Sequence, residues 1–164
     1  MTREGRAASV ADASTRDDPQ PPGPAARAHT DAAALLVNDA GEYLLHLRDH
    51  IPGIRDPGAW SLIGGSREGD ETAGETIDRE ILEEVGLVVA DLRLLCRVEL
   101  PGPGGAAGGR IDVFHGRWNG DAHALPLTEG VMCHWFTRAT SERLRLGPIA
   151  ATALRRHGRS AGVS

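Results

Sequence analysis

The longest periodic pattern of apolar positions predicts an amphipathic helix over residues 72–85. Apolar side chains recur at every fourth position, which places them in one narrow stripe along a helix. They are Ala73, Ile77, Ile81 and Val85. The stretch has no proline and a single glycine, Gly74, and it is followed by Gly86, a residue type that commonly ends helices in the left-handed conformation. The pattern therefore predicts a helix with one buried side.

Short apolar runs bounded by turn residues predict strands on both sides of this helix. The predicted strands cover residues 33–37, 43–48, 60–63, 92–99, 110–118 and 131–136. Turn residues join the first two strands into a hairpin, and a loop rich in Gly, Pro and Ala over residues 101–109 joins a second pair. A last helix is expected to begin at Gly147 and Pro148. This order of elements indicates mixed α and β structure.

Length and composition indicate one globular domain between two less ordered ends. A chain of 164 residues is long enough for one domain with a sizeable core and too short for two ordinary domains. Residues 1–29 are rich in Ala, Arg, Asp, Ser and Pro and lack a periodic apolar pattern, which predicts a disordered N-terminal tail. The domain is expected over residues 30–158, and residues 159–164 are expected to fray.

The net charge and the residue content indicate which binding partners and which cellular compartment to expect for this protein. A net charge of −5 and an aromatic content of 4% argue against broad binding to DNA or RNA. No apolar run is long enough to span a bilayer, and the N-terminal segment lacks the apolar region of a signal peptide, so we expect a cytoplasmic protein without a membrane partner. Cys96 and Cys133 are far apart, which favours reduced thiols over a disulfide framework or a Cys-based zinc site.

Carboxylates near the end of the predicted helix carry the strongest chemical signal. Glu80, Glu83 and Glu84 stand at i, i+3 and i+4, so they are neighbours on one side. Glu80 and Glu84 border the apolar stripe, and Glu83 lies farther round. Arg79 can pair with Glu75 and Glu83, whereas Glu80 and Glu84 repel each other.

Such crowding has two interpretations. An acidic face exposed to solvent is the ordinary outcome for a Glu-rich helix. Like charges beside apolar surface, however, cost free energy unless a proton or a cation neutralises them. Clustered hard oxygen ligands suit Mg²⁺ or Mn²⁺, with waters and substrate phosphates completing the coordination. The arrangement therefore favours a divalent cation site.

The stretch from residue 65 to residue 87 resembles the Nudix box of the Nudix (MutT-like) hydrolases. That box is a glycine, five residues, a glutamate, seven residues, and then Arg-Glu-apolar-x-Glu-Glu-x-Gly-apolar. The specified positions are occupied by Gly65, Glu71, Arg79, Glu80, Ile81, Glu83, Glu84, Gly86 and Leu87. The resemblance implies an α/β/α sandwich, with a mixed, curled sheet between helices.

The resemblance also implies hydrolysis of a nucleoside diphosphate linked to another group X, with Mg²⁺ as cofactor and Mn²⁺ as an alternative. It assigns Glu83 and Glu84 as the main metal ligands. Glu80 is expected to act as a ligand or as the general base, and the Gly65 carbonyl as a further oxygen donor. The ligand is then a small-molecule nucleoside diphosphate derivative. A homodimer is left open, since dimers are frequent in the family.

Residues outside the three glutamates complete the expected site. Glu129, six residues before Trp135, matches the place of a loop carboxylate that completes the metal site or positions the attacking water in MutT-like members. Arg79 is expected to orient the glutamates and Glu71 to support the turn. Which carboxylate is the general base stays open between Glu80 and Glu129.

Two strand residues have open interpretations. Arg48, at a strand end, can reach a phosphate or be a plain surface cation. His46 is expected to be a strand-face residue rather than a ligand.

Two other classes of function are compatible with the resemblance. A Nudix-fold nucleotide sensor that binds without turnover usually has degenerate box residues, and here none is degenerate. A different Nudix chemistry, such as isoprenoid isomerisation or RNA decapping, is the third class. The low aromatic content and the negative charge make decapping the less attractive of these.

Overall fold

A computed structural model describes residues 30–105 and 107–161. The strands are β1 (Thr30–Val37), β2 (Tyr43–Leu47), β3 (Trp60–Ser61), β4 (Ile63–Gly65), β5 (Arg93–Pro101), β6 (Ala107–Arg117) and β7 (Met132–Phe136). The helices are α1 (Ala73–Val85), α2 (Arg138–Ser141) and α3 (Pro148–Ala161), with short 3₁₀ turns η1 (Pro103–Gly105) and η2 (Ala122–Ala124). The predicted tail over residues 1–29 lies outside the described residues.

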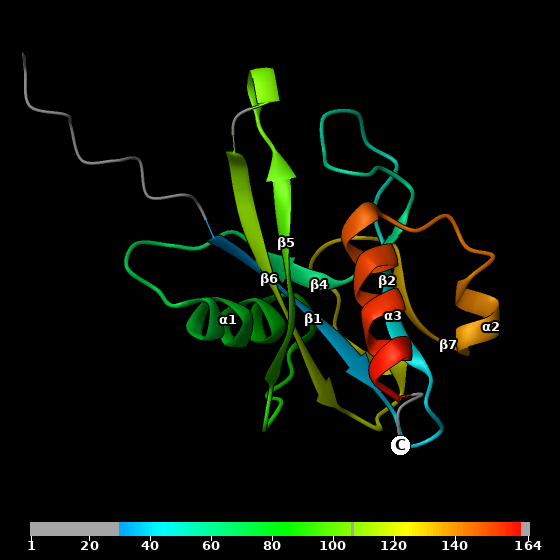
Figure 1. Cartoon of the computed structure of the whole chain (residues 1–164). Helices are drawn as coiled ribbons and strands as arrows, with labels where there is room; N and C mark the ends of the chain where they lie inside the picture. The colour runs from blue at the N-terminus through cyan, green and yellow to red at the C-terminus, as the bar shows by residue number, and fades with distance from the viewer. Residues whose placement is uncertain (1–29, 106, 162–164) are drawn as a thin grey trace, which may run out of the picture.

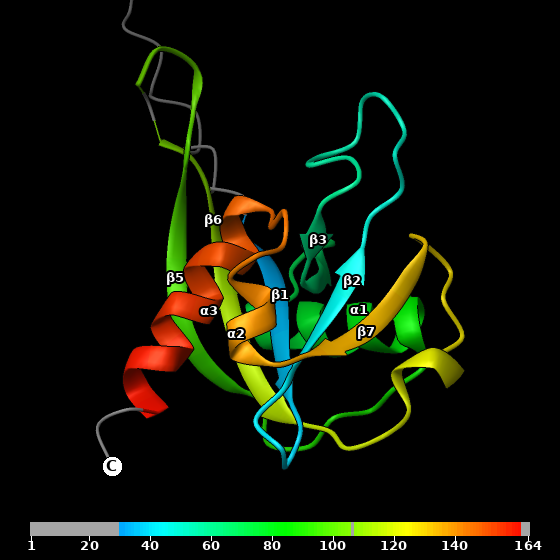
Figure 2. The same ribbon diagram turned by 90° about the vertical axis from the view of Figure 1, so that its right-hand side faces the viewer.

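The helices α1 and α3 both pack against β1. The strands lie in the order β3-β2-β1-β6-β5, with β4 also paired to β1 and β7 to β2. Alternate side chains of β1 enter two separate cores, as the period of two in a strand requires. The core under α1 contains Ala32, Ala34, Leu36, Ile63, Ile77, Ile81 and Val85. The core under α3 contains Ala33, Leu35, Val37, Ile111, Val113, Ala150, Ala153 and Leu154. The helices α1 and α3 therefore cover opposite faces of the sheet (Figures 1 and 2), which confirms the expected α/β/α sandwich.

Both predicted hairpins are present. β1 and β2 pair antiparallel, with Leu36 opposite Leu44. β5 and β6 also pair antiparallel, but these strands extend into the stretch predicted as a loop over residues 101–109. The Gly-rich composition of that stretch weakens strand propensity without preventing the backbone hydrogen bonds of a two-stranded ladder.

The segment predicted as one strand over residues 60–63 forms two strands with different partners. β3 pairs with β2, whereas β4 pairs with β1. Leu62 lies between them and is buried in the core under α3. The apolar pattern gives no sign of this change of partner, because Trp60, Leu62 and Ile63 are all at least partly buried.

The end of β4 approaches β1 so closely that residue 64 must be glycine. Gly64 has a φ of 155° and lies opposite Ala33. A Cβ at this position would overlap the carbonyl oxygen of Ala32. The turn through Gly64 and Gly65 is therefore held against the central strand, and it leads to α1 from a fixed place.

Side chains and backbone geometry define both ends of α1. Thr72 is the N-cap, and its hydroxyl accepts a hydrogen bond from the Glu75 backbone N–H at 3.2 Å. The Glu75 carboxylate in turn accepts from the Thr72 backbone N–H at 2.7 Å, which completes a capping box. The predicted pairing of Glu75 with Arg79 is therefore wrong, because the cap orients Glu75 toward the helix start. At the other end Gly86 adopts the predicted left-handed conformation, with φ 66°.

The last helix begins at Pro148, as predicted, but it continues past Gly158 to Ala161. Gly158 is buried, and a Cβ there would lie 2.6 Å from Cζ of Arg138. The Arg138 guanidinium donates a hydrogen bond to the Gly158 carbonyl at 3.3 Å. The glycine therefore allows α2 to pack against α3, and it does not end the helix. Residues 162–164 lie outside the described residues.

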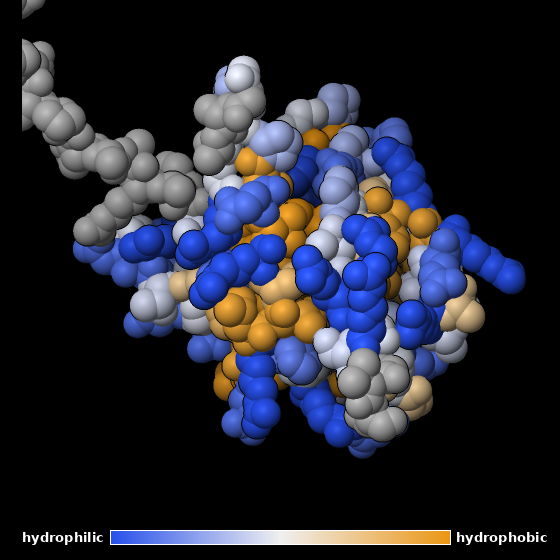
Figure 3. All heavy atoms as spheres, in the orientation of Figure 1, coloured by the Kyte–Doolittle hydropathy of each residue, from blue (hydrophilic) through white to orange (hydrophobic). Residues whose placement is uncertain are grey.

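Apolar surface remains over the edge strand β5, beside α3 (Figure 3). The partly buried residues of β5 that pack against the α3 core are Leu95, Cys96, Val98 and Leu100.

In the part of the chain that the structure describes, no helix is both long and apolar enough to cross a membrane.

The capping box predicts the effect of Thr72→Ala. Removing the cap hydroxyl leaves the Glu75 backbone N–H without this acceptor, so the free energy of unfolding should fall by about 1 kcal/mol. Urea unfolding measures the change, with Thr72→Ser as the control that keeps a cap oxygen. Equal stability of the alanine variant and the wild type would contradict the role of this cap.

Candidate active site

The turn after β4 and the helix α1 bring several predicted residues together. The Glu80 carboxylate lies directly over Gly65, at a place that a Cβ on residue 65 would overlap. The exposed fractions of the Glu84, Glu80 and Glu83 side chains are 11%, 14% and 58%. This order follows from the helix, since Glu84 and Glu80 border the buried stripe and Glu83 lies farther round.

Glu84 combines burial with an unsatisfied oxygen. Its Oε2 atom is buried and has no hydrogen-bond partner among the described residues. The pKa of Glu84 is raised to about 8, mainly by burial and in addition by the charges of Glu80 and Glu129. A hydrogen bond from the Gly64 backbone and the charge of Arg48 offset part of this effect. Without a cation, the neutral acid is therefore favoured at neutral pH.

Arg79 is the internal counter-ion of the neighbouring carboxylates. Its Nε and Nη2 atoms donate to the two oxygens of Glu71 at 2.8 and 3.0 Å, and Nη2 also donates to the Ser66 carbonyl at 3.0 Å. Its Nη1 atom donates to Glu80 at 2.8 Å and to Glu83 at 3.2 Å. One guanidinium thus connects the turn after β4 with two carboxylates of α1.

The two carboxylates closest to Arg79 respond differently to it. The hydrogen bond from Arg79 lowers the pKa of Glu71 to about 2. The pKa of Glu80 is raised nevertheless, because its burial outweighs the hydrogen bond and the charge of Arg79. Burial is therefore the largest influence on the pKa values of Glu80 and Glu84.

The loop before β7 docks on the end of α1 and brings Glu129 to it. Thr128 donates from its backbone N–H to the Glu84 carbonyl and from its hydroxyl to the Glu83 carbonyl, both at 3.2 Å. These carbonyls belong to the last turn of a helix, where no later N–H is available to them. On the other side of the loop, the Gly130 backbone N–H donates to Asp49 at 3.0 Å.

His46 is buried in β2 and acts on the same loop. Its Nε2 atom lies 2.8 Å from the carbonyl oxygen of Glu129, and a carbonyl only accepts, so Nε2 carries the hydrogen. Burial lowers the pKa of His46, which favours the neutral ring. The unprotonated Nδ1 then lies 4.0 Å from Oε2 of Glu84. A Cβ on Gly130 would overlap the imidazole, so the loop requires glycine there.

The predicted ligands are close but are not arranged around a common cation position. Within residues 30–105 and 107–161, no three carboxylate, imidazole or thiolate side chains are grouped as a metal site. Arg79 donates hydrogen bonds to Glu80 and Glu83, and the Glu84 carboxylate is buried beside His46. The residues nevertheless fit a hard divalent cation, because all the donors are oxygen and one Glu84 oxygen is buried without a partner.

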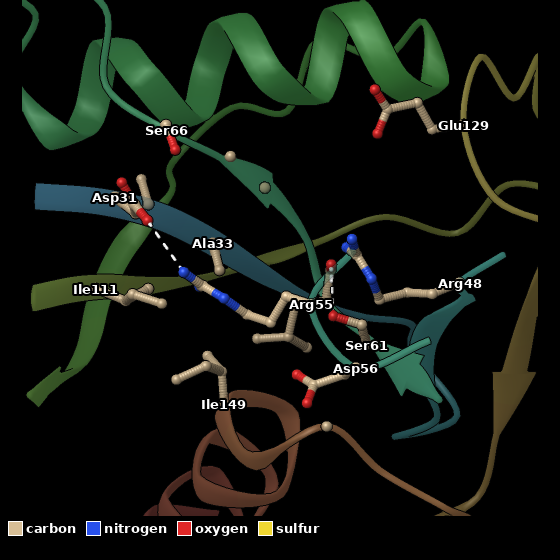
Figure 4. Close-up of a pocket in the computed structure, with 15 residues that line it drawn as sticks. Asp31, Ala33, Arg48, Arg55, Asp56, Ser61, Ser66, Ile111, Glu129 and Ile149 are labelled. Carbon is tan, nitrogen blue, oxygen red and sulfur yellow. Dashed lines mark hydrogen bonds and ion pairs between the residues drawn. The ribbon is translucent and has the colours of Figure 1, made fainter. Parts of the chain in front are cut away.

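A pocket of about 310 Å³ opens beside the turn after β4 (Figure 4). It is lined by Asp31, Ala32, Ala33, Arg48, Arg55, Asp56, Ser61, Leu62, Gly64, Gly65, Ser66, Ile111, Glu129, Gly147 and Ile149. The Nε atom of Arg48 is buried and has no hydrogen-bond partner among the described residues. Arg48 therefore presents a positive charge inside the pocket, between Glu129 on the side of α1 and Asp56 on the side of α3.

The sequence pattern does not predict the roles of several residues of this region. The side chains that hydrogen-bond to backbone atoms of residues distant in the chain are those of His46, Asp49 and Thr128. Asp31 lies in β1 and Asp56 in the loop between β2 and β3, and they meet in one pocket through the packing of β1, this loop and α3.

Comparison with known proteins defines the class. The NUDIX domain model matches residues 27–156, so the chain belongs to the NUDIX domain family. A search of the curated proteins finds no match to this sequence.

Solved structures share the fold. The MutT protein from Methanosarcina mazei Go1 is 24% identical, with a TM-score of 0.67 over 81% of this chain and 94% of that one. The MutT NUDIX hydrolase from Burkholderia pseudomallei is 23% identical, with a TM-score of 0.63 over 78% and 96%. The NUDIX domain of Shewanella oneidensis NrtR, complexed with ADP ribose, is 18% identical, with a TM-score of 0.66 over 80% and 87%. At these identities the similarity shows the shared fold, and the NUDIX domain match supports a pyrophosphohydrolase.

The raised pKa of Glu84 predicts how the stability of the metal-free protein depends on pH. Because the folded state holds this proton more tightly than the unfolded state, the stabilisation is complete below about pH 4.5 and is lost as pH rises toward about 8. Urea unfolding in EDTA should show Glu84→Gln losing less stability than the wild type over this range. One pKa unit corresponds to ~1.4 kcal/mol.

The control for this comparison is Glu75→Gln, at the other end of α1. That variant removes a charge from the same helix and should follow the wild-type profile above pH 5. Parallel profiles for wild type and Glu84→Gln would contradict the burial of an ionisable group at position 84.

Proposed function

We propose that this protein is a Mg²⁺-dependent pyrophosphohydrolase, with Mn²⁺ as an alternative cation. Its substrate is a nucleoside diphosphate linked to another group X, of the nucleoside triphosphate, ADP-ribose or nucleotide-sugar type. The products are a nucleoside monophosphate and phosphorylated X. The observation that carries the proposal is the buried Glu84 carboxylate. One of its oxygens has no hydrogen-bond partner in the part of the chain that the structure describes, and the charges of Glu80 and Glu129 raise its pKa.

The carboxylates of α1 have distinct proposed roles. Glu83 and Glu84 are the main metal ligands, Glu80 is a ligand or the general base, and the Gly65 carbonyl is a further oxygen donor. When bound, the cation neutralises the pyrophosphate and stabilises the leaving group. The hydrogen bonds of Arg79 to Glu80 and Glu83 support these roles, because they orient both carboxylates on one side of α1.

Residues around the carboxylates hold the substrate and the attacking water. Glu129 completes the ligand set or positions the water, and the role of general base is shared between Glu80 and Glu129. The docking of Thr128 on α1 supports this role of its neighbour, since it fixes the loop beside Glu84. Arg48 contacts a substrate phosphate, as its unpartnered Nε suggests.

The proposal extends to partner and compartment. The ligand is a small-molecule nucleotide derivative and not a nucleic acid, which the net charge of −5 supports. We place the protein in the cytoplasm. Light scattering of the purified chain decides between a monomer and the homodimer that the resemblance leaves open.

Binding without turnover is the second candidate function. The fold similarity to a NUDIX domain complexed with ADP ribose favours it, since that domain holds a nucleotide derivative as a ligand. The intact box, from Gly65 to Leu87, favours hydrolysis instead. Release of phosphate separates the two functions.

Hydrolysis of a nucleotide panel tests the proposal. The panel contains dNTPs, ADP-ribose, nucleotide sugars and dinucleoside polyphosphates, each with Mg²⁺ and a coupled phosphatase. Glu83→Gln and Glu84→Gln should each lower turnover by more than about 100-fold, beyond the ~10–100-fold effect of residues that only support metal ligands. Circular dichroism should remain unchanged.

Glu75→Gln is the matched control, because it lies on α1 and contacts the cap rather than the site. It should retain wild-type turnover. Near-normal rates of both ligand variants at saturating Mg²⁺ would refute the assignment, and binding of a nucleotide without any turnover would favour the sensor.

A further inference from the structure

We infer that Asp56 is a specificity-determining residue, and that its end of the pocket receives an uncharged part of the substrate that donates hydrogen bonds. This inference rests on the proposed function, which supplies the pyrophosphate that the other end of the pocket faces. The chemistry selected is a set of N–H or O–H donors, as on the amino edge of a nucleobase or the hydroxyls of a ribose.

The Asp56 carboxylate is free to accept hydrogen bonds. It is half-buried, and among residues 30–105 and 107–161 its side chain has neither a hydrogen-bond nor an ion-pair partner. The residue has a φ of 49°, in the left-handed region that few non-glycine residues adopt. Its own carbonyl accepts a hydrogen bond from the Ala59 backbone N–H at 3.2 Å, so the loop holds Asp56 in this conformation through a local turn.

Gly147 leaves room in front of this carboxylate. A Cβ at position 147 would lie 3.1 Å from Oδ2 of Asp56, closer than an ordinary contact. The glycine is fixed in place, because its backbone N–H donates to the Trp60 carbonyl at 2.9 Å. The absence of a side chain there keeps the Asp56 oxygen accessible from the pocket (Figure 4).

Both ends of the pocket carry carboxylates, and the cation of the proposed function compensates only those of the α1 end. Figure 4 shows Glu129 and Ser66 on the side of α1, Asp56 and Ile149 on the side of α3, and Arg48 between these pairs. Arg55 also enters the pocket, but its Nη2 atom lies 3.9 Å from Oδ2 of Asp31. Because Asp31 offsets the charge of Arg55, the Asp56 end is negative and repels a phosphate.

The pocket walls around Asp56 are formed by aliphatic side chains. Ala33, Ile111 and Ile149 lie around the space that Asp56 faces (Figure 4). None of the described residues that line the pocket is aromatic. A ligand group is therefore oriented here by hydrogen bonds to a carboxylate rather than by stacking on a ring.

These observations orient the substrate. A phosphate is stabilised beside Arg48, whereas the uncharged donor group lies at Asp56. A carboxylate in an apolar surrounding loses water when a ligand enters, so a ligand without matching donors leaves it unpaired and binds more weakly. Asp56 thus selects which nucleoside derivative fits.

Equilibrium binding with Asp56→Asn tests the inference without requiring turnover. The probes are AMP, GMP, CMP and UMP in the presence of Mg²⁺, measured by calorimetry on the full chain. The wild type should bind at least one of them, and Asp56→Asn should weaken that nucleotide about 10-fold or more, the usual effect of losing a hydrogen bond to a charged group. The dissociation constant for pyrophosphate should stay within about twofold.

Analogues identify the donor. If a base amino group contacts Asp56, the nucleotide that lacks this group should bind the wild type more weakly. The comparison is IMP against AMP or GMP, and UMP against CMP, and the difference should vanish in Asp56→Asn. If the ribose 2′-hydroxyl contacts Asp56, the 2′-deoxynucleotide should bind the wild type more weakly than the ribonucleotide. This difference should also vanish in Asp56→Asn. Asp91→Asn is the matched control, because Asp91 is also an aspartate of positive φ, 57°, outside this pocket.

Two results would overturn the inference. One is unchanged or tighter nucleotide binding by Asp56→Asn, which would mean that the pocket end receives an anionic group. The other is a wild type that binds none of the four nucleotides. Asp56-dependent binding without hydrolysis of any panel substrate would instead refute the proposed function and leave the pocket assignment standing.

Discussion

The Glu84 carboxylate is largely buried, and within residues 30–105 and 107–161 one of its oxygens has no hydrogen-bond partner. Glu80, one helical turn earlier, is also largely buried, over the glycine that ends β4. A helix that packed only for stability would place apolar residues at these positions, since burial of like charges costs free energy. The site therefore depends on a charge that the fold holds in an unfavourable place until a proton or a cation compensates it.

The surrounding structure makes this arrangement tolerable. Arg79 is hydrogen-bonded to the turn through Glu71 and Ser66, and it also donates hydrogen bonds to Glu80 and Glu83, which offsets part of their charge. The loop of Glu129 is attached to the last carbonyls of α1 by Thr128. The close approach of Gly64 to β1 fixes the turn at the start. Backbone contacts of small residues thus position a site whose chemistry belongs to long acidic side chains.

Local patterns predicted the parts of the fold that are local in origin. The period of α1, its end at Gly86 and the two hairpins follow from short stretches of sequence. The separation of β3 from β4 depends on which strand each one pairs with, and the extension of α3 past Gly158 depends on Arg138 from α2. In the site, the helix spacing predicted the crowding of Glu80 and Glu84. The contacts of His46 with the Glu129 loop and the position of Asp56 in the pocket arise from tertiary packing, which no spacing encodes.

The central claim is that the α1 carboxylates hold a divalent cation, and calorimetric titration of Mn²⁺ into the metal-free protein tests it most directly. The titration is run at pH 7 in two buffers of different ionisation enthalpy, because a cation that replaces the proton on Glu84 must release it. The account predicts saturable binding whose heat depends on the buffer, with the buffer dependence lost in Glu84→Gln. Absence of binding heat in both buffers, or identical titrations of wild type and Glu84→Gln, would contradict it.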